Sequence, residues 1–440
     1  MKTNRLRLLA PLLFLLLAAP SGAAAQGLNL RDLLTNFLKA GITLAPPATG
    51  VSHVAHFQDA GSPQFQALAA FNTEVAGQLS SFPLASSGGG FTYRFDPDLG
   101  VLVRTTDSFG PVYTERADTI GKGRFAFGIN YSAFTFDTID GLALRDGDLK
   151  LVFTHAPVSS FVAGDVITAD LRLKLTTNIT AFVFTYGLVD AVDLGVVVPL
   201  VKVDMQTQST AAVQRLATGL CCTTIHQFVG GGSSATTTQS GSASGLGDVL
   251  ARAKFRVLRG SAGAMAILAD ARLPTGEERD LLGAGTTQVT GALVGSLHFS
   301  PVSLHANGGY TWVAPKNGVK VVPDQIVYNF GLDVTAHPRL TFSAEVVGRV
   351  VRSTQRVFID SHTYTADRPS ADQTSSSTFS QDFPRLVVSP VMNDNRLSGS
   401  VGVKINPVGN VLVTLNGLFP LTNKGLKDKF TPLVGIDYSF

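Results

Sequence analysis

The residues of this 440-residue chain that could perform acid–base or nucleophilic chemistry are few and scattered. A serine hydrolase of the α/β class would place its nucleophile in a Gly-x-Ser-x-Gly turn, and the sequence has none. The histidines downstream of the N-terminal region lie far apart and outside any short motif with serine and asparagine: His155, His226, His298, His305, His337 and His362. We place His298 and His305 on strands where they would face the interior or neighbouring groups. We therefore do not expect an enzyme.

Metal and cofactor sites are not indicated either. His53 and His56 have the spacing to share a metal on one helix face, but no third ligand lies nearby. The adjacent Cys221 and Cys222 lack a ligand set for zinc and are interpreted as two loop thiols or a local disulfide clip. The glycines at 230–232 are not followed by the lysine and helix of a phosphate-binding loop. Asp367, Asp372 and Asp382 do not have calcium-loop spacing. We expect no cofactor.

Charged residues instead recur at every second position of long apolar segments. In 338–352, for example, Glu345 and Arg349 alternate with Ala344, Val346 and Val350. Such alternation is typical of strands with one apolar and one polar face. An arginine or lysine facing lipid costs about 2–4 kcal/mol at the bilayer midplane, so the charged faces should point inward. The predicted lumen-facing residues are Asp170, Arg172, Lys174, Arg252, Lys254, Arg256, Asp270, Arg272, Glu345 and Arg349.

The composition agrees with a membrane protein built from strands. Mean hydropathy is +0.22, although no segment after the N-terminus has the roughly 18 continuous apolar residues of a membrane helix. The net charge of +3 is too small to indicate nucleic-acid binding.

The elements that position these charges are twelve long strands: 123–137, 164–187, 191–204, 246–259, 261–273, 286–300, 301–314, 324–336, 338–352, 396–406, 409–419 and 430–440. Their connections alternate between short and long, which is typical of short periplasmic turns and longer outer loops. The fold class predicted is all-β, a transmembrane antiparallel up-and-down barrel. The stretch 149–155 could raise the count to fourteen. The polar connections 205–245 and 353–395 are predicted to be mobile outer loops.

The last strand, 430–440, carries Val434, Ile436, Tyr438 and Phe440 on one face. A terminal aromatic residue of this kind, with Tyr438 two positions earlier, resembles the signal by which the barrel assembly machinery recognises outer-membrane proteins.

The region before the barrel divides in two. Residues 1–25 have the charged start, apolar core and small residues of a cleaved signal peptide, which predicts export through the Sec pathway. Residues 26–122 contain helical patterns at 27–41 and 62–82 and a hairpin at 91–105. This segment plugs the lumen or lies in the periplasm, and we favour the plug because its apolar helix faces need cover. The barrel domain is 123–440.

Short motifs at strand ends resemble the outer-membrane proteins described as "MetA-pathway of phenol degradation". They are 186–188 followed by 193–195 and Pro199, then 245–248 followed by 253–255, then 273–277 followed by 282–285. The resemblance covers about 164–440. That family is related to the barrels that take up long-chain fatty acids and other hydrophobic compounds.

The resemblance implies an outer-membrane channel for passive uptake of small hydrophobic or aromatic compounds, with membrane lipid and these solutes as partners. Two alternatives stay open. One is a structural or surface-binding barrel that acts through its outer loops, and the other is a general porin for hydrophilic solutes, which the inward charges would suit.

Overall fold

The computed structural model describes residues 29–34, 44–45, 63–80, 86, 90–96, 101–104, 108–154, 165–215, 227–318, 320, 322–369 and 374–440. The predicted signal peptide, His53, His56, Cys221 and Cys222 lie outside these residues, as do His155 and His226.

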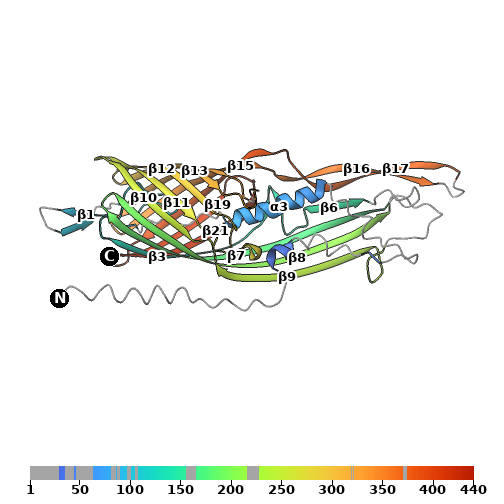
Figure 1. Ribbon diagram of the computed structural model, residues 1–440, viewed down its shortest axis with the longest axis horizontal. Coiled ribbons are helices and arrows are strands. Elements are labelled where there is room, and N and C mark those ends of the chain that lie inside the picture. The colour runs from blue at the N-terminus through green and yellow to red at the C-terminus, as the bar shows by residue number, and fades with distance from the viewer. Residues whose placement is uncertain are drawn as a thin grey trace.

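A closed antiparallel barrel forms the body of the protein (Figure 1). The main sheet has 14 strands, and twelve remain when β6 and β9 at its ends are left out; pairing of β7 with β8 then closes the ring. The twelve strands are β3 (Phe125–Thr135), β7 (Asp165–Val189), β8 (Val192–Arg215), β10 (Leu250–Arg259), β11 (Gly263–Arg272), β12 (Gln288–Phe299), β13 (Val302–Val313), β14 (Gln325–His337), β15 (Leu340–Thr354), β18 (Met392–Ile405), β19 (Val411–Pro420) and β21 (Thr431–Ser439). The predicted fold class and the twelve strands are confirmed.

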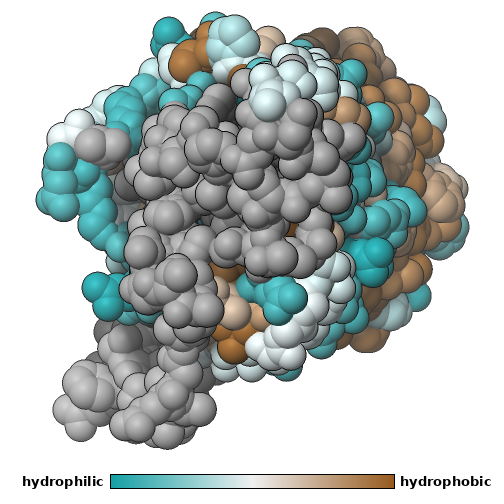
Figure 2. Space-filling view, turned by 90° about the vertical axis from the view of Figure 1, so that its right-hand side faces the viewer, coloured by the Kyte–Doolittle hydropathy of each residue, from teal (hydrophilic) through white to brown (hydrophobic). Residues whose placement is uncertain are grey.

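The outer face of the ring is apolar, because each strand turns every second side chain toward the surroundings. Leu293, Phe330, Phe342 and Ile436 are all at least half exposed. Figure 2 views the molecule from the end of the long connections and shows hydrophobic residues covering the visible flank of the barrel. The helices in the described part of the chain are too short or too polar to cross a lipid bilayer.

The strands β7 and β8 continue far beyond the ring. β7 has 25 residues, whereas a membrane strand needs about 9–11. Only Thr176–Tyr186 of β7 pair with β3, and only Val192–Val197 of β8 pair with β10. The remaining halves pair with β6 (Leu149–Thr154) and β9 (Ser234–Leu246), which are the two strands outside the ring.

The structure corrects the prediction of two mobile outer loops. Within 205–245, the end of β8 and β9 form a regular ladder, and within 353–395, β16 (Val357–Pro369) and β17 (Ser376–Val388) form a hairpin. Serine and threonine misled the prediction, since threonine is β-branched and favours strands. Met205, Ala211 and Val213 also alternate with polar residues, and all three are buried. We call these extended parts of β7 and β8, with β6, β9, β16 and β17, the outer cap.

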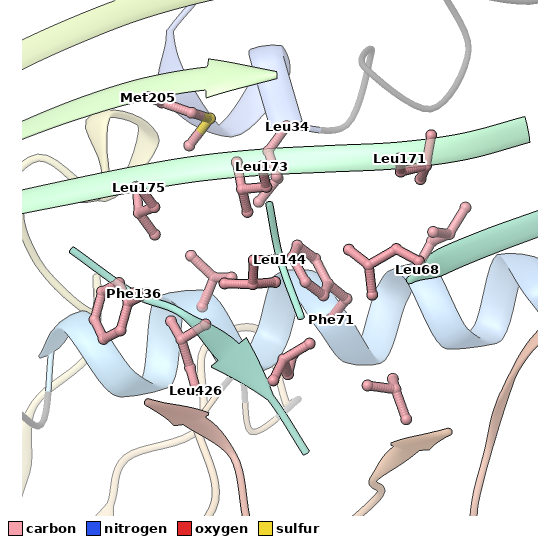
Figure 3. Packing of buried hydrophobic residues seen from close by; sticks show 14 of the residues in the cluster. Leu34, Leu68, Phe71, Phe136, Leu144, Leu171, Leu173, Leu175, Met205 and Leu426 are labelled. Atoms are coloured by element: carbon pink, nitrogen blue, oxygen red, sulfur yellow. The ribbon is translucent and has the colours of Figure 1, made fainter. Parts of the chain in front are cut away.

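The helix α3 (Pro63–Ser80) lies between the two sheets of the outer cap (Figure 1). Its apolar face points toward the leucines of β7, and Leu68 and Phe71 approach Leu171 and Leu173 in Figure 3. The short helix at 30–34 adds Leu30 and Leu34 to this core. The helix predicted at 62–82 and the hairpin at 91–105 are confirmed, the latter as β1 (Tyr93–Asp96) and β2 (Val101–Arg104). Of the helix predicted at 27–41, only 30–34 lies within the described residues.

We expect a charge on the outer face of β21 to destabilise the barrel. Ile436 is 56% exposed on this face, so Ile436→Arg should lower the free energy of unfolding in lipid by about 2 kcal/mol. Urea titration of the protein folded into vesicles measures this. Val408→Arg, in the short turn between β18 and β19, is the matched control and should have little effect. Equal losses in both variants would contradict an apolar belt at β21.

Candidate functional site: the barrel lumen

The inward faces of the strands hold a buried, irregular part of the chain, residues 108–120, which we call the inner segment. Asp118 is half-buried, and the other residues of the inner segment are buried. The carboxylate of Glu345 on β15 accepts hydrogen bonds from the backbone N–H groups of Val112 (2.7 Å), Tyr113 (2.9 Å) and Thr114 (2.7 Å). Gly331 on β14 permits this approach, because a Cβ there would lie 3.0 Å from Thr114 Oγ1.

Other strands between β8 and β18 contribute such anchors. The Asn307 side chain accepts from the Glu115 N–H (2.7 Å) and donates to the Glu115 carbonyl (2.9 Å). Further anchors come from Asp193 on β8 to the Ile120 N–H, Lys254 on β10 to the Arg116 carbonyl, Ser296 on β12 to the Ala117 N–H, and Lys404 on β18 to the Pro111 carbonyl. Because these strands span the arc of the ring from β8 through β12 and β15 to β18, the inner segment crosses its interior.

A buried serine–histidine–aspartate chain belongs to the same anchoring system. Ser296 Oγ lies 2.8 Å from His305 Nδ1, and His305 Nε2 lies 2.7 Å from Asp333 Oδ1. These are the residue types of a hydrolase triad. Ser296, however, is 2% exposed, and its hydroxyl already accepts a hydrogen bond from the Ala117 N–H. In this conformation the three side chains therefore hold the inner segment in place.

At the outer end of the ring, ion pairs fix α3 to the barrel wall. Glu74 accepts a hydrogen bond from Arg396 Nη2 on β18 (2.9 Å), and Arg396 Nε also donates to Asp394 (2.9 Å). Gln78 pairs with Arg349 on β15. Burial alone would raise the pKa of Glu74, but the Arg396 guanidinium outweighs it and holds this pKa below its ordinary value.

A cavity of about 240 Å³ lies in the lumen between α3 and the inner segment. Gln78 lines it from the helix, and Tyr113 and Glu115 line it from the inner segment. A second cavity of about 200 Å³ is lined by Gly110, Arg116 and His298. The inner segment contributes to both cavities and separates them.

The predicted lumen-facing residues divide into two groups. Those on β10, β11 and β15 line the cavity or contact the inner segment: Arg252, Lys254, Arg256, Asp270, Arg272, Glu345 and Arg349. Arg252 pairs with both Glu115 and Asp270, the latter at 2.6 Å.

Asp170, Arg172 and Lys174 do not line the lumen. They lie on the part of β7 that extends into the outer cap, where they are exposed and the alternate leucines point inward. Asp170 pairs there with Lys150 at 3.0 Å. Alternation distinguishes two faces of a strand but does not tell which is enclosed, so the inward assignment was wrong for this end of β7. Tyr438 and Phe440 lie exposed on the outer surface, and Phe440 stacks on Phe125.

Sequence reasoning missed Asp193, Asp333, Arg396 and Lys404, and left His305 open. All lie at inward positions of predicted strands, so counting every polar residue on the charged face of each strand would have found them. Glu74 had no such signal, since its partner lies 322 positions away.

Comparisons with known proteins match one family and several solved structures. The family described as "Putative MetA-pathway of phenol degradation" matches residues 159–374. An outer membrane channel from Pseudomonas putida F1 has 11% sequence identity and a TM-score of 0.42, covering 74% of this chain and 98% of its own. A Pseudomonas aeruginosa FadL homologue has 11% identity and a TM-score of 0.31, with coverages of 72% and 89%. The Ralstonia pickettii toluene transporter TbuX has 10% identity and a TM-score of 0.26, with coverages of 73% and 90%. No curated protein matches the sequence.

We expect Glu345→Gln to loosen the inner segment. The amide has one acceptor oxygen in place of two and no charge, so about 2 kcal/mol of hydrogen bonding to the segment is lost, which raises the fraction of displaced segment about thirtyfold. Single-channel recordings in planar bilayers should show more frequent or larger openings. Asp146→Asn, at an exposed turn, is the control. Unchanged recordings for Glu345→Gln would contradict the anchoring role.

Lys427, beside α3, should make stability depend on pH. Burial, together with Arg349 and Arg396, lowers the pKa of Lys427 to about 7. Between pH 7 and the ordinary lysine pKa the unfolded chain binds more protons than the folded one, so this residue makes stability rise with pH across that window. Lys427→Met should therefore stabilise the protein at pH 6 and lose this advantage toward pH 10. Thermal unfolding measures both, with the exposed Lys429→Met as control. A gain independent of pH would contradict the depressed pKa.

Proposed function

We propose that this chain, whose residues 159–374 match the family described as "Putative MetA-pathway of phenol degradation", is an outer-membrane channel for the passive uptake of small hydrophobic or aromatic compounds. The bacterial outer membrane is the location that the family and the closed barrel support. Export through the Sec pathway by residues 1–25, and recognition of the last strand by the barrel assembly machinery, are part of this proposal.

The observation that carries the proposal is the lumen cavity. Its volume of about 240 Å³ exceeds the roughly 150 Å³ of an engineered apolar cavity that binds benzene. Leu250, Leu268 and Val327 line it alongside polar groups. A single aromatic ring with a small substituent therefore fits, and a long acyl chain does not fit in this conformation.

In this proposal, solutes approach the cavity from outside along the apolar core around α3. This core extends from Leu68 and Phe71 in the outer cap to Phe136 and Leu418, which also line the cavity. Apolar compounds partition into such surroundings by about 25 cal/mol per Å² of buried surface. The inner segment stands between the cavity and the other end of the barrel. Passage is passive in this scheme, because displacement of the inner segment gives solutes a path down their gradient.

Uptake into vesicles tests the proposal. Vesicles with the full-length protein should admit benzyl alcohol faster than empty vesicles, and should not admit a sugar of similar size faster. Glu345→Gln should increase uptake, and Asp146→Asn should not. Sugar entry at the rate of benzyl alcohol would indicate a general porin. Entry of neither compound would indicate a sealed structural barrel, and each of these results would reject the proposal.

A further inference from the structure

Two hydrogen-bond donors that border the lumen cavity have no hydrogen-bond acceptor within the described residues, although Asp248 and Asp270 attract the first of them at longer range. One is the guanidinium group of Arg272 on β11, which forms no hydrogen bond and no ion pair shorter than 4 Å with the described residues. The other is Nε2 of Gln288 on β12, which is buried and forms no hydrogen bond. The whole residue is only 4% exposed. A buried donor without a partner is rare and costly, so the Gln288 amide, beside the half-buried Arg272 guanidinium group at the same cavity wall, points to a ligand.

The strand register brings the two donors together. Arg272 and Gln288 are directly opposite each other in the β11–β12 ladder. The Cβ atoms of such pairs lie about 5 Å apart. A guanidinium group presents a planar fork that matches the two oxygens of a carboxylate, and an adjacent amide N–H adds a further donor.

The nearest acidic side chains are engaged elsewhere. Asp270 is held by Arg252, through Nε at 2.7 Å and Nη2 at 2.6 Å. Asp248 accepts the backbone N–H groups of Gly276 at 3.1 Å and Ala284 at 2.8 Å. Neither carboxylate therefore occupies the Arg272 fork.

The rest of the cavity wall suits an aromatic anion. Its cationic side chains outnumber its acidic ones, with Arg252, Arg272, Arg349 and Arg396 against Glu115, Asp270 and Asp428. Apolar surface lies beside the two donors. Leu250 is the cross-strand partner of Arg272 on β10, and Leu268 lies four residues before Arg272 on the same face of β11.

We propose that Arg272 and Gln288 bind the carboxylate of a small aromatic acid whose ring packs against Leu250 and Leu268. Such an acid is then a solute that the channel selects over neutral compounds. This inference rests on the proposed function for its biological use, but the binding site is testable apart from transport.

Calorimetric titration of the full-length protein in detergent with benzoate measures the site. Wild-type protein should bind benzoate, and should bind acetate much more weakly because acetate lacks the ring. Arg272→Gln should weaken benzoate binding about tenfold or more, since it removes a charge-assisted contact. Gln288→Leu should weaken it less, and Arg272→Lys should retain part of it. The control is Arg279→Gln, an exposed arginine between β11 and β12, which should bind benzoate like the wild type.

Two results would overturn the site: equal benzoate affinity in Arg272→Gln and the wild type, or acetate binding as tight as benzoate binding. The variants should remain folded, because Arg272 makes no hydrogen bond that folding needs, and a thermal unfolding scan confirms this. Vesicle uptake separates the two hypotheses. Benzyl alcohol entry without benzoate binding rejects the acid site and keeps the proposed function, whereas benzoate binding without entry of either compound keeps the site and rejects the channel.

Discussion

An irregular chain enclosed by a barrel must find hydrogen-bond partners for its backbone, and this constraint accounts for much of the polar interior. The inner segment has neither helix nor ladder to satisfy its N–H and C=O groups, and an unpaired buried backbone group is costly. Glu345 alone satisfies three N–H groups, while Lys254 and Lys404 satisfy carbonyls. Inward charges such as Glu345, Lys254 and Lys404 are thus hydrogen-bond partners of the inner segment.

Different interactions stabilise the two ends of the barrel interior. Around α3 the core is apolar, and ion pairs such as Glu74–Arg396 fix the helix at its edge. Around the inner segment, directional hydrogen bonds join apolar contacts such as that of Phe109 with Leu412. Apolar packing tolerates small shifts, whereas a network of buried hydrogen bonds is satisfied in one arrangement only. A segment held in this second way has one favoured position, and its displacement breaks several hydrogen bonds at once.

The sequence is most informative where periodicity is long. Alternation placed all twelve ring strands and the inward positions of Arg252, Lys254 and Glu345, because a residue that faces lipid is under strong chemical constraint. Alternation could not show where the ring ends along β7. In the outer cap, Leu171 and Leu173 alternate with charged residues in the same way that apolar and charged residues alternate in the ring. The path of the inner segment could not be predicted from the sequence for another reason. Its backbone has no repeat, and each anchor is a contact between residues far apart in sequence.

The continuity of β7 and β8 has a consequence for how the outer cap can be altered. These two strands pair from Asp165 and Arg215 down to the turn at Val189 and Val192, so the cap grows out of the seam that closes the barrel. At about 3.3 Å per residue, the 25 residues of β7 make a ribbon about 80 Å long. Residues can leave this ribbon only in facing pairs and in even steps, because an odd deletion would turn every leucine of the cap core outward. The length of the outer cap can therefore change only in steps of two residues on each strand.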